Sequence, residues 1–86
     1  MVTATEDKDS AVWFPLDVVE ANVIRGESLV KAWREHLGLT QAEVARRAGM
    51  SQPAYARLER PDARPRTATL KKIARAMGLS LDHLTD

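Results

Sequence analysis

The sequence predicts an all-α protein, and three patterns in it support that fold class. Apolar residues recur three or four positions apart, which is the spacing of one helix face. Serine or threonine precedes several of these runs and glycine follows them, as expected at helix starts and ends. No stretch alternates β-branched and polar residues in the manner of a strand. With 86 residues, the chain is expected to form one domain of about five helices with an extra N-terminal helix.

The N-terminal end differs in composition from the rest of the chain. Residues 1–14 are rich in charged and polar side chains and show no helical period, so we expect them to form a flexible acidic arm. Residues 15–86 are expected to form the folded domain.

The extra N-terminal helix is predicted to begin at Pro15, a residue that suits the first turn of a helix. Leu16, Val19 and Val23 then recur at helical spacing and predict one apolar side for this helix. Gly26 is a suitable stop for it.

A second helix is predicted to begin after Ser28, whose hydroxyl can cap it. Leu29, Trp33 and Leu37 lie four positions apart and form one apolar stripe along this helix. Gly38 is expected to end it.

The segment TQAEVARRAGMSQPAYARLE, from Thr40 to Glu59, predicts two short helices joined by a tight corner. The hydroxyl of Thr40 and the carboxylate of Glu43, three positions later, are the two parts of a capping box. Gly49 is expected to turn the corner with a left-handed backbone. Ser51 is expected to cap the second of the two helices.

The last part of the chain predicts one more core helix and a final short turn. Thr67 or Thr69 is expected to open this helix after the loop RPDARPR, and Gly78 to end it. Ser80 is expected to cap the final turn. The predicted buried face of the helix is Leu70, Ile73, Ala74 and Met77.

Charge divides the chain into unequal parts, although the net charge is only +1. Residues 1–27 contain six acidic and two basic side chains, whereas residues 28–81 contain eleven basic and four acidic ones. A basic surface attracts phosphate, and an acidic segment attracts a basic protein. The division therefore indicates a nucleic-acid partner for the body and leaves a protein partner open for the N-terminal part.

Several function classes find no support in the sequence. There is no cysteine, and the two histidines, His36 and His83, are far apart and are expected at the surface, so we expect no metal site and no cofactor. No nucleophile stands at a suitable spacing from a base, so we expect no enzymatic activity. No segment is long and apolar enough to cross a membrane, and we expect a cytoplasmic protein.

Two helices joined by a tight corner suggest DNA recognition, because the second helix protrudes and an α-helix fits the major groove. Its exposed positions are predicted to be Gln52, Pro53, Ala54 and Arg57. Glutamine has the donor and acceptor to pair with adenine, and arginine has the donors to pair with guanine. We expect Tyr55 to pack in the core rather than to reach a phosphate.

The stretch LGLTQAEVARRAGMSQPAYARLE resembles the helix-turn-helix of the lambda-repressor-like family, also called the XRE family. The resemblance covers about residues 29–84 and implies that Gln41 holds a DNA phosphate. It also implies an ion pair between Arg34 and Glu59. The predicted DNA-binding residues are Thr40, Gln41, Ser51, Gln52, Pro53, Ala54, Arg57, Arg64 and Arg66.

The chain departs from the family pattern on the recognition helix. Pro53 occupies a position where the family often has a polar base-reading residue, and a proline side chain makes no hydrogen bond. Ala54 offers only a methyl group to a thymine. Direct readout is therefore expected to depend mainly on Gln52 and Arg57, with phosphate contacts supplying most of the affinity.

Four short motifs also resemble HigA-like antitoxins, which accompany RelE/ParE-type toxins. They are PLDVV from Pro15, GES from Gly26, AWREH from Ala32 and LTQ from Leu39. The resemblance implies a homodimer that represses its own operon at a palindromic operator and neutralises a toxin. Trp13, Phe14 and Leu16 are the predicted partner-binding residues of the acidic N-terminal part. The alternative for Trp13 and Phe14 is that they fold back and complete the core.

Two other functions remain open from the sequence. One is a solitary phage-like repressor without a toxin. The other is a protein-interaction module on the same fold, but Gln52 and Arg57 on the exposed face, with no acid between them on that face, favour DNA.

Overall fold

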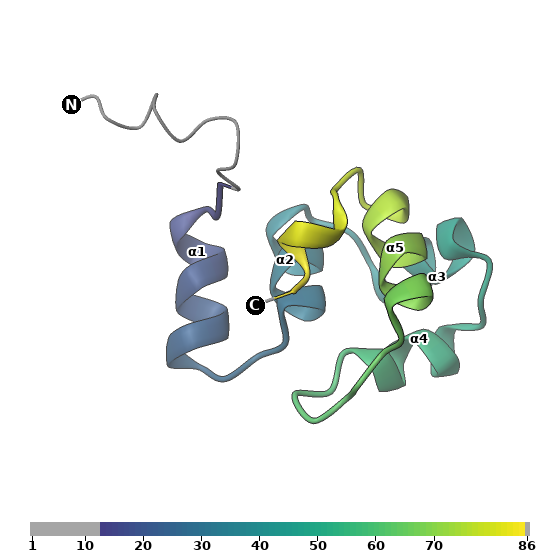
Figure 1. Cartoon of the computed structure of the whole chain (residues 1–86), viewed down its shortest axis with the longest axis horizontal. Helices are drawn as coiled ribbons and strands as arrows, with labels where there is room; N and C mark the ends of the chain where they lie inside the picture. Colours follow the sequence, from purple (N-terminus) through teal and green to yellow (C-terminus); the bar gives the residue numbers. More distant parts are fainter. Residues whose placement is uncertain (1–12, 86) are drawn as a thin grey trace.

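The computed structural model describes residues 13–85 and contains only helices and loops in that range (Figure 1). The predicted arm, residues 1–14, therefore lies outside the described residues except for its last two positions. The elements, in order, are α1 (Leu16–Val19), the π-helical turn η2 (Glu20–Ile24), α2 (Leu29–His36), α3 (Gln41–Ala48), α4 (Gln52–Leu58), α5 (Thr67–Ala76) and the 3₁₀ turn η3 (Leu81–His83). The all-α prediction is confirmed.

The extra N-terminal helix consists of α1 and η2, which follow each other without a break. Its buried residues are Val18 and Ala21, which lie in the hydrophobic core. The predicted apolar side is a different one: Leu16 and Val23 are 72% and 71% exposed. The helix therefore has apolar residues on two sides: Val18 and Ala21 belong to the core, whereas the side predicted from the spacing of Leu16 and Val23 faces outward.

The second helix, α2, begins as predicted. The Ser28 hydroxyl accepts a hydrogen bond from the backbone N–H of Lys31 and donates one to the backbone carbonyl of Glu59, at 3.1 and 2.8 Å. One side chain thus caps α2 and fastens it to the end of α4. Leu29 and Trp33 are buried, whereas Leu37 follows the last helical residue and is 38% exposed.

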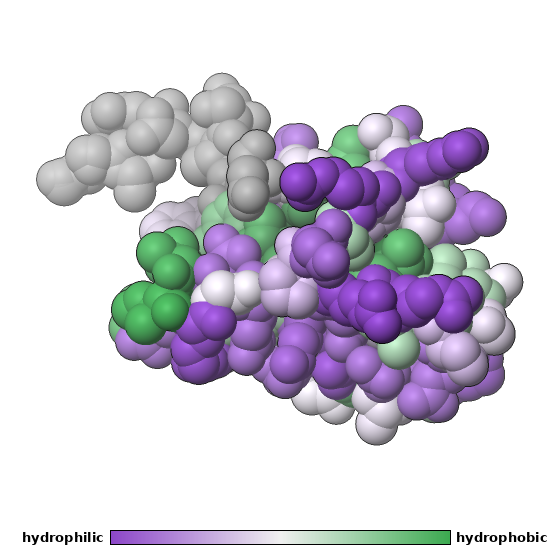
Figure 2. Space-filling model, turned by 90° about the horizontal axis from the view of Figure 1, so that it is seen from below, coloured by the Kyte–Doolittle hydropathy of each residue, from purple (hydrophilic) through white to green (hydrophobic). Residues whose placement is uncertain are grey.

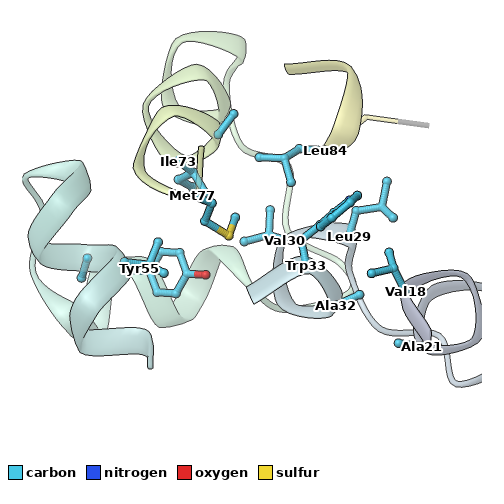
Figure 3. Close-up of a cluster of buried hydrophobic side chains, with 13 residues drawn as sticks. Val18, Ala21, Leu29, Val30, Ala32, Trp33, Tyr55, Ile73, Met77 and Leu84 are labelled. Atoms are coloured by element: carbon cyan, nitrogen blue, oxygen red, sulfur yellow. The ribbon is translucent and has the colours of Figure 1, made fainter. Parts of the chain in front are cut away.

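The hydrophobic core runs through the middle of the bundle and joins α1 and α2 to α3, α4, α5 and η3 (Figure 3). Tyr55 of α4 and Ile73 of α5 are completely buried, as is Val18 of α1. Tyr55 therefore packs in the core, as expected. The thirteen buried apolar residues are Val18, Ala21, Leu29, Val30, Ala32, Trp33, Val44, Ala45, Tyr55, Ile73, Ala74, Met77 and Leu84.

The corner between α3 and α4 has the predicted geometry. Gly49 has φ 74°, a left-handed backbone that glycine adopts without steric cost. The N–H of Met50 then donates to the carbonyl of Ala45 at 2.9 Å, which satisfies a carbonyl at the end of α3. The chain thereby turns within the three residues 49–51 and places α4 against α3.

The C-terminal part, α5 and η3, closes the bundle. α5 begins at Thr67, one of the two threonines expected to open it; Arg66 precedes it, and no side chain caps that end. The backbone N–H of Ser80 donates to Nδ1 of His83 at 3.1 Å. The His83 ring is half-buried and meets Trp33 edge-on at a centroid distance of 5.2 Å, so one side of this surface residue packs against the core.

Candidate nucleic-acid interface

The outer face of α4 carries the side chains that the sequence predicted to read bases. Gln52, Pro53 and Arg57 are exposed, and Ala54 is half-exposed. Pro53 stands in the first turn of α4, where its missing N–H removes no helical hydrogen bond. Gln52 and Arg57 are therefore the polar side chains that this face offers to a groove.

The start of α3 adjoins the start of α4 through two glutamine side chains. The amide nitrogen of Gln52 donates to the amide oxygen of Gln41 at 3.4 Å. The amide nitrogen of Gln41 in turn donates to Glu59 at 2.9 Å. The predicted phosphate-contacting residue and the predicted base-reading residue thus lie side by side, and both are tied to the interior.

Glu59 is the centre of a buried polar network behind this face. Its side chain is 4% exposed and pairs with the guanidinium of Arg34 through two N–H donors. The hydroxyl of Tyr55 also donates to Glu59, at 2.6 Å, and Arg34 donates separately to the backbone carbonyl of Leu39 at 2.9 Å. The ion pair implied by the family resemblance is therefore present and joins α2 to the end of α4.

The network determines the ionisation of its members. Burial opposes ionisation of Glu59, but the hydrogen bonds from Arg34, Tyr55 and Gln41 outweigh it and hold the pKa of this carboxyl below its ordinary value. Burial, followed by the hydrogen bond to Glu59, raises the pKa of the Tyr55 hydroxyl. The hydrogen bond to Glu59 raises the pKa of Arg34. A charged pair and a neutral phenol are thus the stable forms near neutral pH.

Thr40 and Ser51, which we predicted at the interface, both act as helix caps. The Thr40 hydroxyl accepts from the backbone N–H of Glu43 at 3.0 Å, and the Glu43 carboxylate accepts from the Thr40 N–H at 2.8 Å. The Ser51 hydroxyl accepts from the N–H of Ala54 at 3.2 Å. These caps fix the starts of α3 and α4, where free N–H groups favour a phosphate.

The two arginines predicted to contact the DNA backbone do not lie on α3 or α4. Arg64 and Arg66 are exposed in the loop between α4 and α5. Within the part of the chain that the structure describes, no hydrogen bond or ion pair joins them to α4. Their contact with DNA stays a prediction.

Three other basic side chains lie beside the candidate interface. Arg25, Lys31 and Arg60 line a hollow of about 320 Å³, and Gln41 forms part of the same wall. They come from the end of η2, from α2 and from the residues after α4, so no spacing in the sequence groups them. Their positions add positive charge to the same side as Gln41.

The residues predicted to bind a protein partner are divided by the structure. Phe14 packs against the core, with its ring centroid 5.9 Å from that of Trp33. Trp13 and Leu16 are 74% and 72% exposed. The alternative that these residues complete the core therefore describes Phe14, and it does not describe Trp13.

A sequence profile of helix-turn-helix proteins matches residues 30–84, which is more than half of the chain and includes α3, the Gly49 corner and α4. The chain belongs to the helix-turn-helix family. The matched segment contains Gln41, Gln52 and Arg57, together with both members of the Arg34–Glu59 pair. The chain is thus a DNA-binding regulator by family, and its XRE-like character, expected from the sequence, is confirmed.

Among curated proteins, the chain is similar to antitoxin HigA1 of Mycobacterium tuberculosis. The identity is 40% over 50 residues for the protein of strain CDC 1551 / Oshkosh, and the same for that of strain ATCC 25618 / H37Rv. The match covers 58% of this chain but only 34% of either relative. No solved structure is significantly similar to the chain.

Other kinds of site are not evident in the described part of the molecule. Residues 13–85 contain no group of three side chains placed to hold a metal ion. Within the same residues, no helix has the length and apolar character that a membrane crossing requires.

Proposed function

We propose that this protein is the antitoxin of a toxin–antitoxin pair and that it represses transcription of its own operon by binding a specific DNA sequence. The observation that carries the DNA part is the pair of exposed readers on α4, Gln52 and Arg57, beside Gln41. The similarity to HigA1 supports the antitoxin part. Such a regulator acts in the cytoplasm.

Base readout in this proposal depends on two side chains. Gln52 pairs with an adenine, and Arg57 pairs with a guanine through two of its N–H donors. Gln41 and the N–H groups at the start of α3 hold a phosphate, which sets the depth of α4 in the groove. Arg64 and Arg66 supply further contacts to the DNA backbone.

The functional unit is proposed to be a homodimer on a palindromic operator. A single α4 reads only a few base pairs, and two copies related by a two-fold axis double that number. In this arrangement the half-sites lie about one helical turn apart, roughly 34 Å. The toxin is proposed to be of the RelE/ParE type, a small basic protein that binds the acidic N-terminal part of the antitoxin.

Fluorescence anisotropy tests the DNA part of the proposal. The full chain is titrated onto labelled DNA from upstream of its own gene and onto a scrambled duplex, at several salt concentrations. We expect preference for the upstream DNA and a linear fall of log affinity with log salt. The Gln52→Ala/Arg57→Ala double variant is expected to keep the non-specific binding and lose the preference.

Two outcomes contradict the proposal. Equal binding of both duplexes by the unaltered chain would show that it does not recognise this DNA alone. Unchanged preference in the double variant would show that α4 does not read the bases. The first result would favour a helix-turn-helix that serves a protein surface.

A further inference from the structure

The helix formed by α1 and η2 has two apolar sides, of which the domain uses one. Val18 and Ala21 are buried, whereas Leu16, Val23 and Ile24 are 72%, 71% and 76% exposed. Five of the six large apolar side chains that are exposed within residues 13–85 lie between Trp13 and Ile24. Figure 2 shows hydrophobic surface gathered at the end of the molecule where α1 and η2 lie. Clustered apolar exposure of this kind is typical of an interaction surface.

A cavity on this helix provides a place for an anchoring side chain. Its volume is about 280 Å³, which is enough for one large apolar side chain. It is lined by Phe14, Val19, Asn22, Val23, Leu29 and Thr85. Phe14 is held from behind by Trp33, so the cavity exists before a partner arrives.

The charge around this face indicates what kind of partner fits it. Residues 13–27 contain three acidic side chains and one basic one, whereas residues 28–85 contain eleven basic and five acidic ones. Asp17 and Glu20 are exposed on the helix itself. A basic partner would be attracted to them, whereas a second copy of this chain would bring the same acids together across a two-fold axis.

The position of the face leaves the DNA interface free. In Figure 1, α1 lies at one end of the molecule and α4 lies toward the other, with α2 between α1 and the rest of the bundle. A protein on the outer side of α1 and η2 therefore does not cover Gln52 or Arg57.

We infer that the outer face of α1 and η2, formed by Leu16, Val19, Val23 and Ile24 around this cavity, is the docking surface for a basic toxin. The inference rests on the proposed antitoxin function and adds the site to it. The partner inserts an apolar side chain between Val19 and Val23, and its basic residues face Glu20, since the Asp17 carboxylate is already paired with Nδ1 of His36 at 2.8 Å. Because α4 lies away from this face, DNA and the toxin are bound at the same time.

The test is isothermal titration of the full chain with the purified product of the neighbouring toxin reading frame. In the Val23→Ser/Ile24→Ser double variant both side chains are exposed, so the fold is expected to be kept. We expect the double variant to bind the toxin at least about tenfold more weakly. The matched control is Leu37→Ser, another exposed apolar position, which follows α2 outside this face and is expected to leave toxin affinity unchanged.

Two further measurements sharpen the result. Both variants should bind operator DNA like the unaltered chain, which shows that the fold is intact. Glu20→Lys should weaken toxin binding more at low salt than at high salt, because exposed charges are screened by salt.

The outcomes separate the docking site from the antitoxin function. Toxin binding by the unaltered chain with equal affinity in the double variant overturns the docking site and leaves the antitoxin function standing. No toxin binding by the unaltered chain overturns both. A dimer by sedimentation that becomes monomeric in the double variant would show that a second copy occupies the face, and this also overturns the inference.

Discussion

The two ends of the molecule hold their exposed side chains in different ways. At the α3–α4 end, Gln52 is hydrogen-bonded to Gln41, which is bonded to the buried carboxylate of Glu59. At the α1–η2 end, Leu16 and Ile24 have no polar groups, and only the burial of the opposite side of the helix positions them. Hydrogen bonds fix direction, whereas packing fixes only position. The first end is therefore suited to reading bases and the second to accepting an apolar surface.

The largest expected effect comes from disrupting the polar network at the α3–α4 end. Glu59→Ala leaves the Arg34 guanidinium and the Tyr55 hydroxyl without their acceptor in a buried site. We expect the free energy of unfolding to fall by roughly 3–5 kcal/mol, measured by urea denaturation. The matched control is the exposed acid Glu35. Glu35→Ala should change the free energy of unfolding by less than about 0.5 kcal/mol. Equal effects of the two variants would mean that the network does not stabilise this end.

A second substitution separates base recognition from stability at the α3–α4 end. Arg57→Ala removes an exposed side chain, so the unfolding transition should stay in place. We expect a loss of about 1–3 kcal/mol in binding energy that is confined to one base pair of the operator. Anisotropy with a set of operators that each carry one altered base pair measures this. A uniform loss across all of them would assign Arg57 to the DNA backbone instead.

The third prediction compares the two sides of the N-terminal helix. Val18→Ala removes two methyl groups from a fully buried position and should lower the free energy of unfolding by about 2 kcal/mol. Val23→Ala, at a position 71% exposed, should change it by less than about 0.5 kcal/mol. Thermal or urea unfolding of both variants measures the difference. Similar losses would show that Val23 is covered in solution, as by a second copy of the chain.

Replacing a glycine of left-handed backbone should have a smaller effect on stability, equal at both ends of the molecule. Gly26 follows η2 and Gly49 ends α3, and both have φ 74° with no atom within 4 Å of an added Cβ. Replacing either with alanine should cost about 1 kcal/mol of unfolding free energy, because only the backbone conformation is strained. A much larger loss at Gly49 would show that the corner also needs room for movement.

The smallest expected effect concerns how stability falls at acidic pH. The pKa of Glu59 is held below its ordinary value of 4.5, so its contribution to stability is complete above pH 4.5 and is lost as the pH falls through the lower, folded value. The hydrogen bond from His36 lowers the pKa of Asp17 at the other end in the same direction, but Asp17 is exposed. Glu59→Gln should therefore flatten the acid limb of the stability curve more than Asp17→Asn. The reverse order would contradict the central role of the buried carboxylate.

The parts of the fold that local signals encode were predictable. Thr40 with Glu43 and the glycine at position 49 each fix a helix end through neighbouring residues, and the structure has both features. The ion pair of Arg34 with Glu59 joins positions 25 apart and was available only through the family resemblance. The candidate base-reading residues on α4 were predicted from the helix–corner–helix pattern and matched by the resemblance, and the exposure of Gln52 and Arg57 agrees with that prediction.

The features that could not be predicted from the sequence depend on which neighbouring surface a helix packs against. Periodicity shows that a helix has an apolar side, but α1 and η2 have two, and Val18 rather than Leu16 faces α2. The contact between His83 and Trp33 joins η3 to α2, which are far apart in the sequence, and no pattern in the sequence indicates it. The hollow beside Gln41 gathers side chains from three elements, so it too could be found only in three dimensions.

The series of hydrogen bonds from Gln52 through Gln41 to Glu59 also affects how the operator preference of this protein could change in evolution. Arg57 stands outside that series of hydrogen bonds, so mutation there can change the preferred operator while the domain stays as stable as before. In the proposed binding mode Gln41 holds a phosphate, and it also donates a hydrogen bond to Glu59, so mutation there is expected to alter DNA affinity and the interior together. New regulatory circuits are therefore expected to arise first through Arg57, with the two glutamines as slow-changing positions.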